Sequence, residues 1–284
     1  MAKQQNIIAG QLKKGRCCII RCLAALILIL ILPSCTEEAE LGALIQEAPG
    51  PIVVEGRIAE GENALIVLTR PASLADPENF PQVTDAKVTL LDNRGNGEEL
   101  LHLGYGHYRS LRIQGQRGVQ YSLAIEAGSE KVAGRSFMPL VPVVVDSALH
   151  RQVRDEAGFL RSQIALYFQD PSGQADFAWM RLTIQANNRE RKYYFFYQDD
   201  DGDDQYREWL LPLNLLLSHG QIARIELFQV EEAVFFFFKS ILEQVSPGEE
   251  VVFLAPPANL SANLEGSSPG YFAATVRTEI VVEP

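Results

Sequence analysis

The strongest chemical bias in the sequence lies in a run of five carboxylates within six positions, from Asp199 to Asp204. Carboxylates this close repel one another unless water, a basic side chain or a cation lies between them. Calcium takes about six to eight oxygen ligands, often from acidic loops, but here the glycine stands fourth in the run, which does not fit the EF-hand spacing. The pattern favours a solvated hairpin tip, with a calcium site at Asp199, Asp201 and Asp203 as the alternative.

A second pattern, Gly266-Ser267-Ser268-Pro269-Gly270, matches the G-x-S-x-G motif in which hydrolases hold a nucleophilic serine. Such an elbow needs a strand before it, a helix after it and a histidine later in the chain. Here a strand is expected after the motif, and all four histidines lie upstream: His102, His107, His150 and His219. They also lack the cysteine partners and the HExxH spacing of a zinc site. We therefore predict a Pro-containing loop, no catalytic residue and no cofactor.

Several aromatic side chains could either stack on sugar rings or fill a core: Trp179, Tyr193, Tyr194, Tyr197, Tyr206 and Trp209. The paired carboxylates of a glycosidase could also be present among 36 Asp and Glu residues. Aromatic residues at strand spacing more often pack in a core. Core packing is therefore the interpretation that the sequence favours.

One cysteine, Cys35, has the context of a lipidation site. Basic residues precede an apolar run of 11 residues, Cys22 to Leu32, and no acidic residue occurs before Cys35. A bilayer span needs roughly 20 apolar residues, so this run has the size of a signal-peptide core. The sequence Leu32-Pro33-Ser34-Cys35 resembles a lipobox, which predicts removal of a signal peptide at 1–34 and lipid on the Cys35 thiol. An ordinary secretory signal or an uncleaved anchor helix is the alternative.

Cleavage at this position would leave a strongly acidic chain. Loss of five leader cations leaves 25 − 5 = 20 Lys and Arg against 36 Asp and Glu, so the net charge becomes 20 − 36 = −16. Nucleic-acid binding depends on Lys and Arg that meet phosphates, so no nucleic-acid partner is expected. The first part of the predicted tether, 35–50, contains Thr36-Glu37-Glu38-Ala39-Glu40. This run resembles the surface-export signal of Bacteroidota lipoproteins, although a merely solvated tether would be acidic too.

The elements that must position these residues are mainly strands, and we expect two β domains. The first, 51–140, is an Ig-like sandwich, because short alternating strands are separated by turn residues. Its Pro71–Thr84 segment contains three prolines and should be a surface loop. The expected strands are Ile52–Ala59, Ala64–Arg70, Ala86–Asp92, Glu98–Leu103, His107–Leu111, Val119–Glu126 and Lys131–Met138.

The second domain, 141–284, is expected to be β-rich with one short helix, after a stiff connection at Met138–Val143. The helix should run from Glu231 to Gln244, because acidic residues occupy its first turn and Ser-Pro-Gly ends it. Its run of four phenylalanines favours packing against a sheet, with a partner-binding face as the alternative. The expected strands are Leu160–Gln169, Phe177–Ala186, Lys192–Gln198, Ile222–Val230 and Tyr271–Val282.

A series of short motifs follows the lipobox: Val53-Val54-Glu55-Gly56, Gly106-His107-Tyr108, Gly118-Val119-Gln120-Tyr121-Ser122-Leu123, Pro139-Leu140-Val141-Pro142, Pro256-Pro257-Ala258-Asn259-Leu260 and Gly270-Tyr271-Phe272-Ala273-Ala274. Their order resembles the Bacteroidota lipoprotein family catalogued as domain of unknown function 4249, over nearly the whole chain after the signal peptide. Through Gly106, Tyr108, Gly118 and Tyr121, the N-terminal half also resembles the carboxypeptidase-regulatory-like β-sandwich modules of outer-membrane proteins. One departure is Glu265-Gly266-Ser267-Ser268-Pro269, where the family often has more glycine.

This resemblance implies a cellular location and an architecture but no activity, since the family has no established activity. Members of the family commonly accompany TonB-dependent transporters. We therefore expect a non-enzymatic lipoprotein, held in the outer membrane by its lipid and facing the cell exterior, that serves such a transporter as a binding or accessory module. A cell-surface hydrolase of glycan or peptide, or a structural envelope protein, is the alternative. Convergent carboxylates in a pocket would indicate an enzyme, and an exposed aromatic patch a binding module. The Pro71–Thr84 and Pro256–Pro269 segments are candidate partner contacts.

Overall fold

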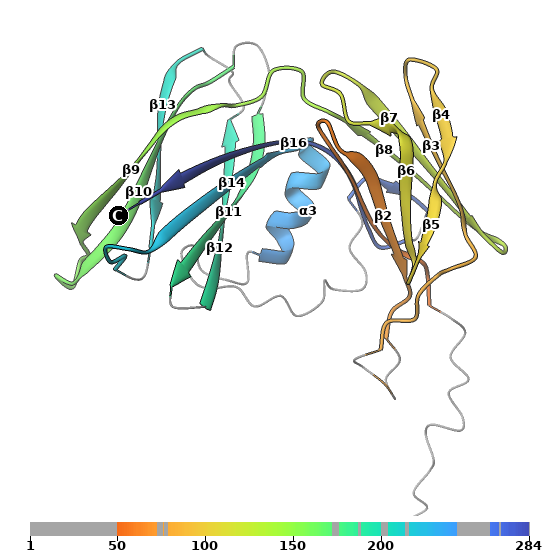
Figure 1. Ribbon diagram of the computed structural model, residues 1–284, viewed down its shortest axis with the longest axis horizontal. Helices are drawn as coiled ribbons and strands as arrows, with labels where there is room; N and C mark the ends of the chain where they lie inside the picture. The colour runs from red at the N-terminus through yellow and green to blue at the C-terminus, as the bar shows by residue number, and fades with distance from the viewer. Residues whose placement is uncertain are drawn as a thin grey trace, which may run out of the picture. The chain divides into compact units, whose positions relative to one another are not determined.

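The computed structural model describes residues 50–72, 76, 79–171, 176–186, 189–199, 204–213, 216–242, 262–266 and 268–283. Residues Glu47–Pro284 belong to one compact unit. The predicted signal peptide, Cys35 and the acidic tether lie outside the described residues. Within the described ranges the fold is mainly β, with several sheets and one short helix, which confirms the expected fold class (Figure 1).

An eight-stranded sheet runs through both halves of the described chain, in the order β12-β11-β14-β16-β1-β2-β6-β5. The β1–β16 pair is parallel, and every other neighbouring pair is antiparallel. The strands are β1 (Val53–Ala59), β2 (Asn63–Thr69), β5 (Leu101–Gly104), β6 (His107–Gln114), β11 (Asp176–Ala186), β12 (Arg189–Asp199), β14 (Ile222–Gln229) and β16 (Gly270–Val282).

Strand β16 joins the two halves of this sheet. Its first part, from Gly270 to Thr275, pairs with β1, and its second part, from Val276 to Val282, pairs with β14. The final strand of the sequence therefore completes the sheet of the N-terminal sandwich as well as that of the C-terminal half. The two halves keep separate hydrophobic cores, which is compatible with the predicted division into two domains.

Two smaller sheets cover one face of the eight-stranded sheet. Alternate side chains of a strand point to opposite faces, and β16 sends Phe272 and Ala274 into the first core and Val282 into the second. A five-stranded sheet closes the first core and a three-stranded sheet the second. They comprise β3 (Lys87–Asp92), β4 (Gly97–Glu99), β7 (Gln120–Ala127), β8 (Glu130–Phe137) and β15 (Leu264–Glu265), and then β9 (Val145–Arg154), β10 (Leu160–Gln169) and β13 (Tyr206–Pro212).

Most predicted strands begin and end within three residues of the observed ones, but one prediction is wrong. The single strand expected over Glu98–Leu103 is two strands, β4 and β5, which belong to different sheets. The chain crosses between the sheets at Leu100, whose N–H donates to the carbonyl of Val88. Glu98 and Leu100 are both buried at this crossing, so the local alternation looks like that of one continuous strand.

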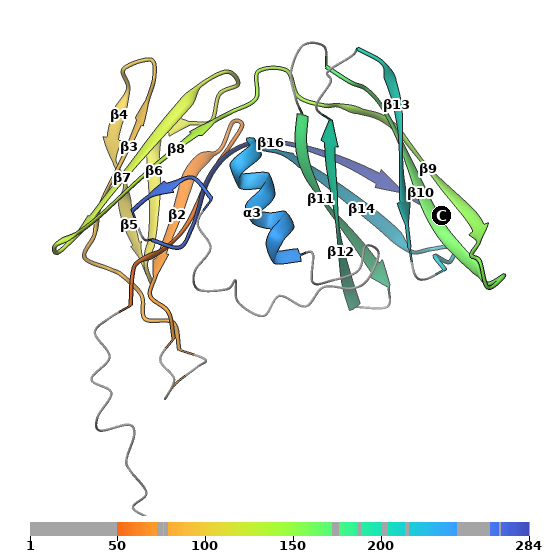
Figure 2. The same ribbon diagram turned by 180° about the vertical axis from the view of Figure 1, so that it is seen from behind.

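Helix α3 (Glu232–Leu242) lies on the opposite face of the eight-stranded sheet (Figures 1 and 2). Phe235 packs against Phe177 of β11 and Phe196 of β12, with ring centroids 5.4 and 5.6 Å apart. Phe235 and Phe237 are buried, whereas Phe236 is 42% exposed. The phenylalanine run therefore packs mainly against the sheet, as expected.

This asymmetry within α3 predicts different effects for two neighbouring substitutions. Phe235→Leu should lower the free energy of unfolding by about 1 to 2 kcal/mol, because a buried ring is replaced by a smaller side chain that leaves a cavity. Phe236→Leu should change it by less than about 0.5 kcal/mol, as at most exposed positions. Urea denaturation followed by circular dichroism measures both, and equal effects would show that α3 is not seated on the sheet in this way.

Candidate functional site

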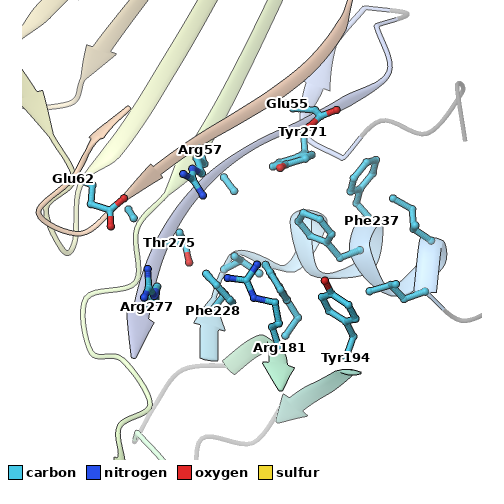
Figure 3. Close-up of a pocket in the computed structure, with 17 residues that line it drawn as sticks. Glu55, Arg57, Glu62, Arg181, Tyr194, Phe228, Phe237, Tyr271, Thr275 and Arg277 are labelled. Carbon is cyan, nitrogen blue, oxygen red and sulfur yellow. The ribbon is translucent and has the colours of Figure 1, made fainter. Parts of the chain in front are cut away.

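A pocket of about 460 Å³ opens between α3 and the uncovered part of the same sheet face (Figure 3). Its size falls within the range of about 300 to 1,000 Å³ that is typical of small-molecule sites. Strands β1, β11, β12, β14 and β16 all contribute to it. The lining residues are Glu55, Arg57, Ala59, Glu62, Trp179, Arg181, Tyr194, Phe228, Val230, Phe237, Phe238, Ile241, Leu242, Tyr271, Ala273, Thr275 and Arg277.

One wall of the pocket is aromatic. Trp179 and Phe228 are cross-strand partners on β11 and β14, and their rings stack with centroids 4.1 Å apart and an interplanar angle of 11°. Phe238 of α3 lies 5.2 Å from Trp179 and 4.9 Å from Tyr271, measured between centroids. These rings form an apolar wall against which a ligand could bury area.

The other wall carries arginines that are held by a buried carboxylate. Glu226 of β14 accepts from Nε of Arg181 through Oε2 at 2.7 Å, and its Oε1 lies 3.3 Å from Nε of Arg277. Only 7% of the Glu226 side chain is exposed. Burial alone would raise the pKa of Glu226, but the hydrogen bond from Arg181 and the charges of the nearby arginines outweigh burial and hold the pKa below its usual value. Glu226 therefore stays ionised and orients both guanidinium groups.

The contacts of Glu226 with Arg181 and Arg277 belong to a wider charge network on the same sheet face. Arg277 Nη2 donates to Glu279 at 2.9 Å, and Arg224 Nη1 donates to the same carboxylate at 2.5 Å. Three guanidinium groups, those of Arg181, Arg224 and Arg277, thus share the carboxylates of Glu226 and Glu279. The network carries one positive charge in excess.

Arg57 brings a further positive charge to the pocket. It stands on β1 opposite Ala273 of β16, and its side chain is exposed. Among the described residues, no carboxylate oxygen lies within 4.0 Å of its guanidinium group. Figure 3 shows Arg57 and Arg181 entering the pocket from opposite sides. A guanidinium group that is not neutralised within the protein is available to an anionic ligand.

The two carboxylates of the lining are separated from each other. Glu55 and Glu62 lie at opposite ends of the pocket in Figure 3. Glu55 and Ala59 are four residues apart on an extended strand, which is roughly 13 Å, and Glu62 lies further along the chain. The carboxyl groups of a glycosidase pair lie about 5 to 9.5 Å apart. Glu55 and Glu62 therefore do not form such a pair.

Burial shifts the pKa of two further polar groups of the pocket. It raises the pKa of Glu55, against the opposing effect of the His107 charge. Burial raises the pKa of Tyr271 to about 12, and the neighbouring Glu55 carboxylate acts in the same direction. The phenol is therefore a hydrogen-bond donor at neutral pH. The described lining contains no histidine, cysteine or serine. Arginine does not lose its proton in proteins, so these guanidinium groups can bind charge but cannot act as general bases.

The structure separates the predicted aromatic set into two groups. Tyr193 is buried in the second core, and Tyr197 and Trp209 pack against it, which confirms core packing for these three. Trp179 and Tyr194 line the pocket instead, and Tyr206 is 59% exposed. The arginines of the pocket and the Glu226 carboxylate that orients them were not predicted. Alternation along β11 and β14 does place Arg181 and Glu226 on the same face as Trp179 and Phe228.

The acidic run is described only at its ends. Asp199 ends β12 and accepts from Nη2 of Arg207 at 3.2 Å. Asp201 and Asp203, the other two residues of the calcium alternative, lie outside the described residues. In the described part of the chain no group of three His, Cys, Asp or Glu residues could hold a metal ion.

The four histidines and the described residues of the serine motif are not in the lining of the pocket, although His107 lies close enough to Glu55 of the lining to affect its pKa. Ser268 is buried and β16 begins at Gly270, so a strand follows the motif, as the sequence predicts. Ser267 lies outside the described residues. His102 stacks on Tyr108 at 4.8 Å between centroids, and a ring nitrogen of His150 lies 2.8 Å from Oγ of Ser162. Burial lowers the pKa of His150, which keeps its ring neutral as a structural hydrogen-bond partner.

These features define a mainly β protein whose large sheet carries an aromatic and arginine-lined pocket on the face that α3 partly covers. No helix in the described ranges is both long and apolar enough to cross a membrane. The chain belongs to the family described as Domain of unknown function (DUF4249), whose sequence profile matches residues 39–280.

Comparisons with other proteins add little to this assignment. No curated protein matches the chain significantly. One solved structure to which it is similar is the selenomethionine-substituted chicken interferon gamma receptor alpha chain. The identity is 9% and the TM-score 0.18, over 64% of this chain and 88% of that chain. A likeness of this kind carries no argument about fold or function.

Proposed function

We propose that this protein is an outer-membrane lipoprotein on the cell surface that serves a TonB-dependent nutrient transporter as a non-enzymatic binding or accessory module. The observation that carries the proposal is the pocket, which combines stacked rings with oriented arginines and whose two lining carboxylates lie at opposite ends. Such a lining can hold a ligand, and the described part of it contains no histidine, cysteine or serine. A rigid sheet beneath the pocket suits a protein that presents a ligand to a partner.

The proposed location rests on the N-terminal sequence. A basic start, an apolar run of 11 residues and a lipobox-like Leu32-Pro33-Ser34-Cys35 favour cleavage and lipidation at Cys35. The acidic run that follows resembles the export signal of surface lipoproteins in Bacteroidota. The proposed association with a transporter rests on the resemblance, because similar lipoproteins commonly accompany TonB-dependent transporters.

Lipidation makes a direct prediction for Cys35→Ser. The variant should incorporate no fatty acid and should remain as the uncleaved precursor, because the thiol accepts the lipid and is the first residue of the mature protein. Metabolic labelling with an alkyne fatty acid, followed by gel analysis, measures both effects. Cys22→Ser is the matched control, since Cys22 lies within the predicted signal peptide, and it should label normally. Equal labelling of wild type and Cys35→Ser would contradict the lipoprotein assignment.

Surface display is tested by protease treatment of intact cells. The described domain should be degraded in cells whose periplasmic proteins remain intact, because its anchor is expected in the outer leaflet. The predicted acidic signal gives a matched pair of variants: neutral replacement of Glu37, Glu38 and Glu40 should protect the protein, whereas the same number of neutral replacements near the C-terminus should not. Protection of the wild-type protein would refute surface display.

A further inference from the structure

We infer that the pocket binds an amphiphile whose apolar body packs against the aromatic wall and whose anionic group is bound by Arg57. This inference deepens the proposed binding function and rests on it, but it does not depend on the transporter. The body and the headgroup are supported by separate observations.

The apolarity of the body follows from the rings. Trp179 and Phe228 stack face to face, and the guanidinium carbon of Arg181 lies over the Phe228 ring, 5.5 Å from its centroid. Phe238 is tilted by 34° to the Trp179 ring, and the two centroids are 5.2 Å apart. An apolar group placed against these rings is removed from water, which favours binding.

The charge of the headgroup follows from the arginines. Arg181, Arg224 and Arg277 share the carboxylates of Glu226 and Glu279, whereas Arg57 has no carboxylate oxygen within 4.0 Å among the described residues. Counted with Glu55 and Glu62, the pocket and its network hold four guanidinium groups and four carboxylates, so the attraction for an anion is local to Arg57 and is not a net charge of the pocket.

The position of the headgroup follows from the carboxylates that frame it. Glu55 and Glu62 stand at the two ends of the pocket, and Arg57 lies between them (Figure 3). An anionic group at either end would meet a like charge, which costs binding energy, while one between the ends meets the guanidinium group of Arg57.

Two fluorescent probes that differ only in charge provide the test. 8-Anilinonaphthalene-1-sulfonate has a flat aromatic body with one sulfonate, and N-phenyl-1-naphthylamine is the same body without it. The protein is residues 36–284 with Trp209→Phe, which leaves Trp179 as the sole tryptophan. Energy transfer from Trp179 to the probe then reports binding in the pocket and gives a dissociation constant for each probe.

Arg57→Gln should raise the dissociation constant of the sulfonate probe roughly tenfold, the loss of affinity expected when a hydrogen bond to a charged group is removed. The dissociation constant of the neutral probe should not change. Arg109→Gln is the control, because Arg109 lies in the same cross-strand row on the same face, two strands away and outside the pocket. It should affect neither probe. Thermal unfolding without probe should be the same for all three proteins.

The outcomes separate this inference from the proposed function. A loss of affinity in Arg57→Gln for the sulfonate probe alone supports the anionic headgroup. Equal affinity of both probes, with no effect of Arg57→Gln, would overturn the headgroup assignment but keep a binding pocket. Energy transfer to neither probe would contradict both the headgroup assignment and the use of this pocket in the proposed function.

Discussion

Gly270→Ala should destabilise the protein by about 3 to 5 kcal/mol, among the largest effects of a single substitution. Gly270 has a φ of 114°, which L side chains rarely adopt. A Cβ at this position would lie 1.9 Å from the carbonyl oxygen of Val54, so the backbones of β1 and β16 would have to separate. The parallel pairing of these strands begins at this contact, which Val54 stabilises by donating its N–H to Pro269 at 3.0 Å.

Gly128→Ala separates conformational strain from steric clash. Gly128 also has a positive φ, 59°, but a Cβ there would have no neighbour within 4 Å. Its substitution should cost about 1 to 2 kcal/mol, as expected for strain alone. Urea denaturation of both variants gives the comparison. A Gly270→Ala effect no larger than that of Gly128→Ala would show that β1 and β16 do not approach each other as described.

Glu98→Ala should lower the free energy of unfolding by about 3 to 4 kcal/mol, because the Glu98 carboxylate accepts hydrogen bonds from a stretch of β6 that has no partner in the neighbouring strands. Its buried carboxylate accepts from the N–H groups of Leu111, Arg112 and Ile113, at 2.5, 2.9 and 3.2 Å. Removal of the carboxylate leaves these donors without their partner, at about 1 to 3 kcal/mol for each group that stays buried. Water can reach part of the site, so the expected total is below the sum.

The neighbouring residue supplies the matched control for this prediction. Glu99 is exposed and its carboxylate lies 3.9 Å from Nζ of Lys87, and an exposed pair of this kind contributes less than about 1 kcal/mol. Glu99→Ala should therefore be nearly neutral, and Glu98→Gln should be intermediate, because its amide retains one acceptor oxygen. Thermal and urea unfolding rank the variants. Equal stability of Glu98→Ala and Glu99→Ala would contradict the role assigned to Glu98.

Sequence periodicity predicts strands where one face is buried and fails at the edges of sheets. Strands β7 and β10 were found because their buried residues alternate or form an apolar run. Strands β9 and β13 were missed for a physical reason. Both are edge strands, β9 has no buried residue, and β13 ends at Pro212. Edge strands are often polar or end in proline, so they lack the signal on which prediction depends.

The partners of a strand depend on the whole fold, which explains what could not be predicted. The sequence of β16 indicates a strand, but it does not reveal that one part pairs with β1 and the other with β14. The pocket exists only because this arrangement brings Arg57, Arg181 and Arg277 together from three strands. The aromatic residues gave a partial signal, since Trp179 and Tyr194 were among the residues weighed for ligand binding. The arginines gave none, because a charged residue on a strand usually marks a solvated face.

The most direct test of the central claim is purification of the lipidated protein from native outer membranes in mild detergent, through a C-terminal tag. Mass spectrometry of the eluate should identify a TonB-dependent transporter in near-equal amount. The Cys35→Ser variant, which should not reach the outer membrane, serves as the control and should recover none. Recovery of the wild-type lipoprotein without any transporter, under conditions that preserve a known outer-membrane complex, would contradict the accessory role proposed here.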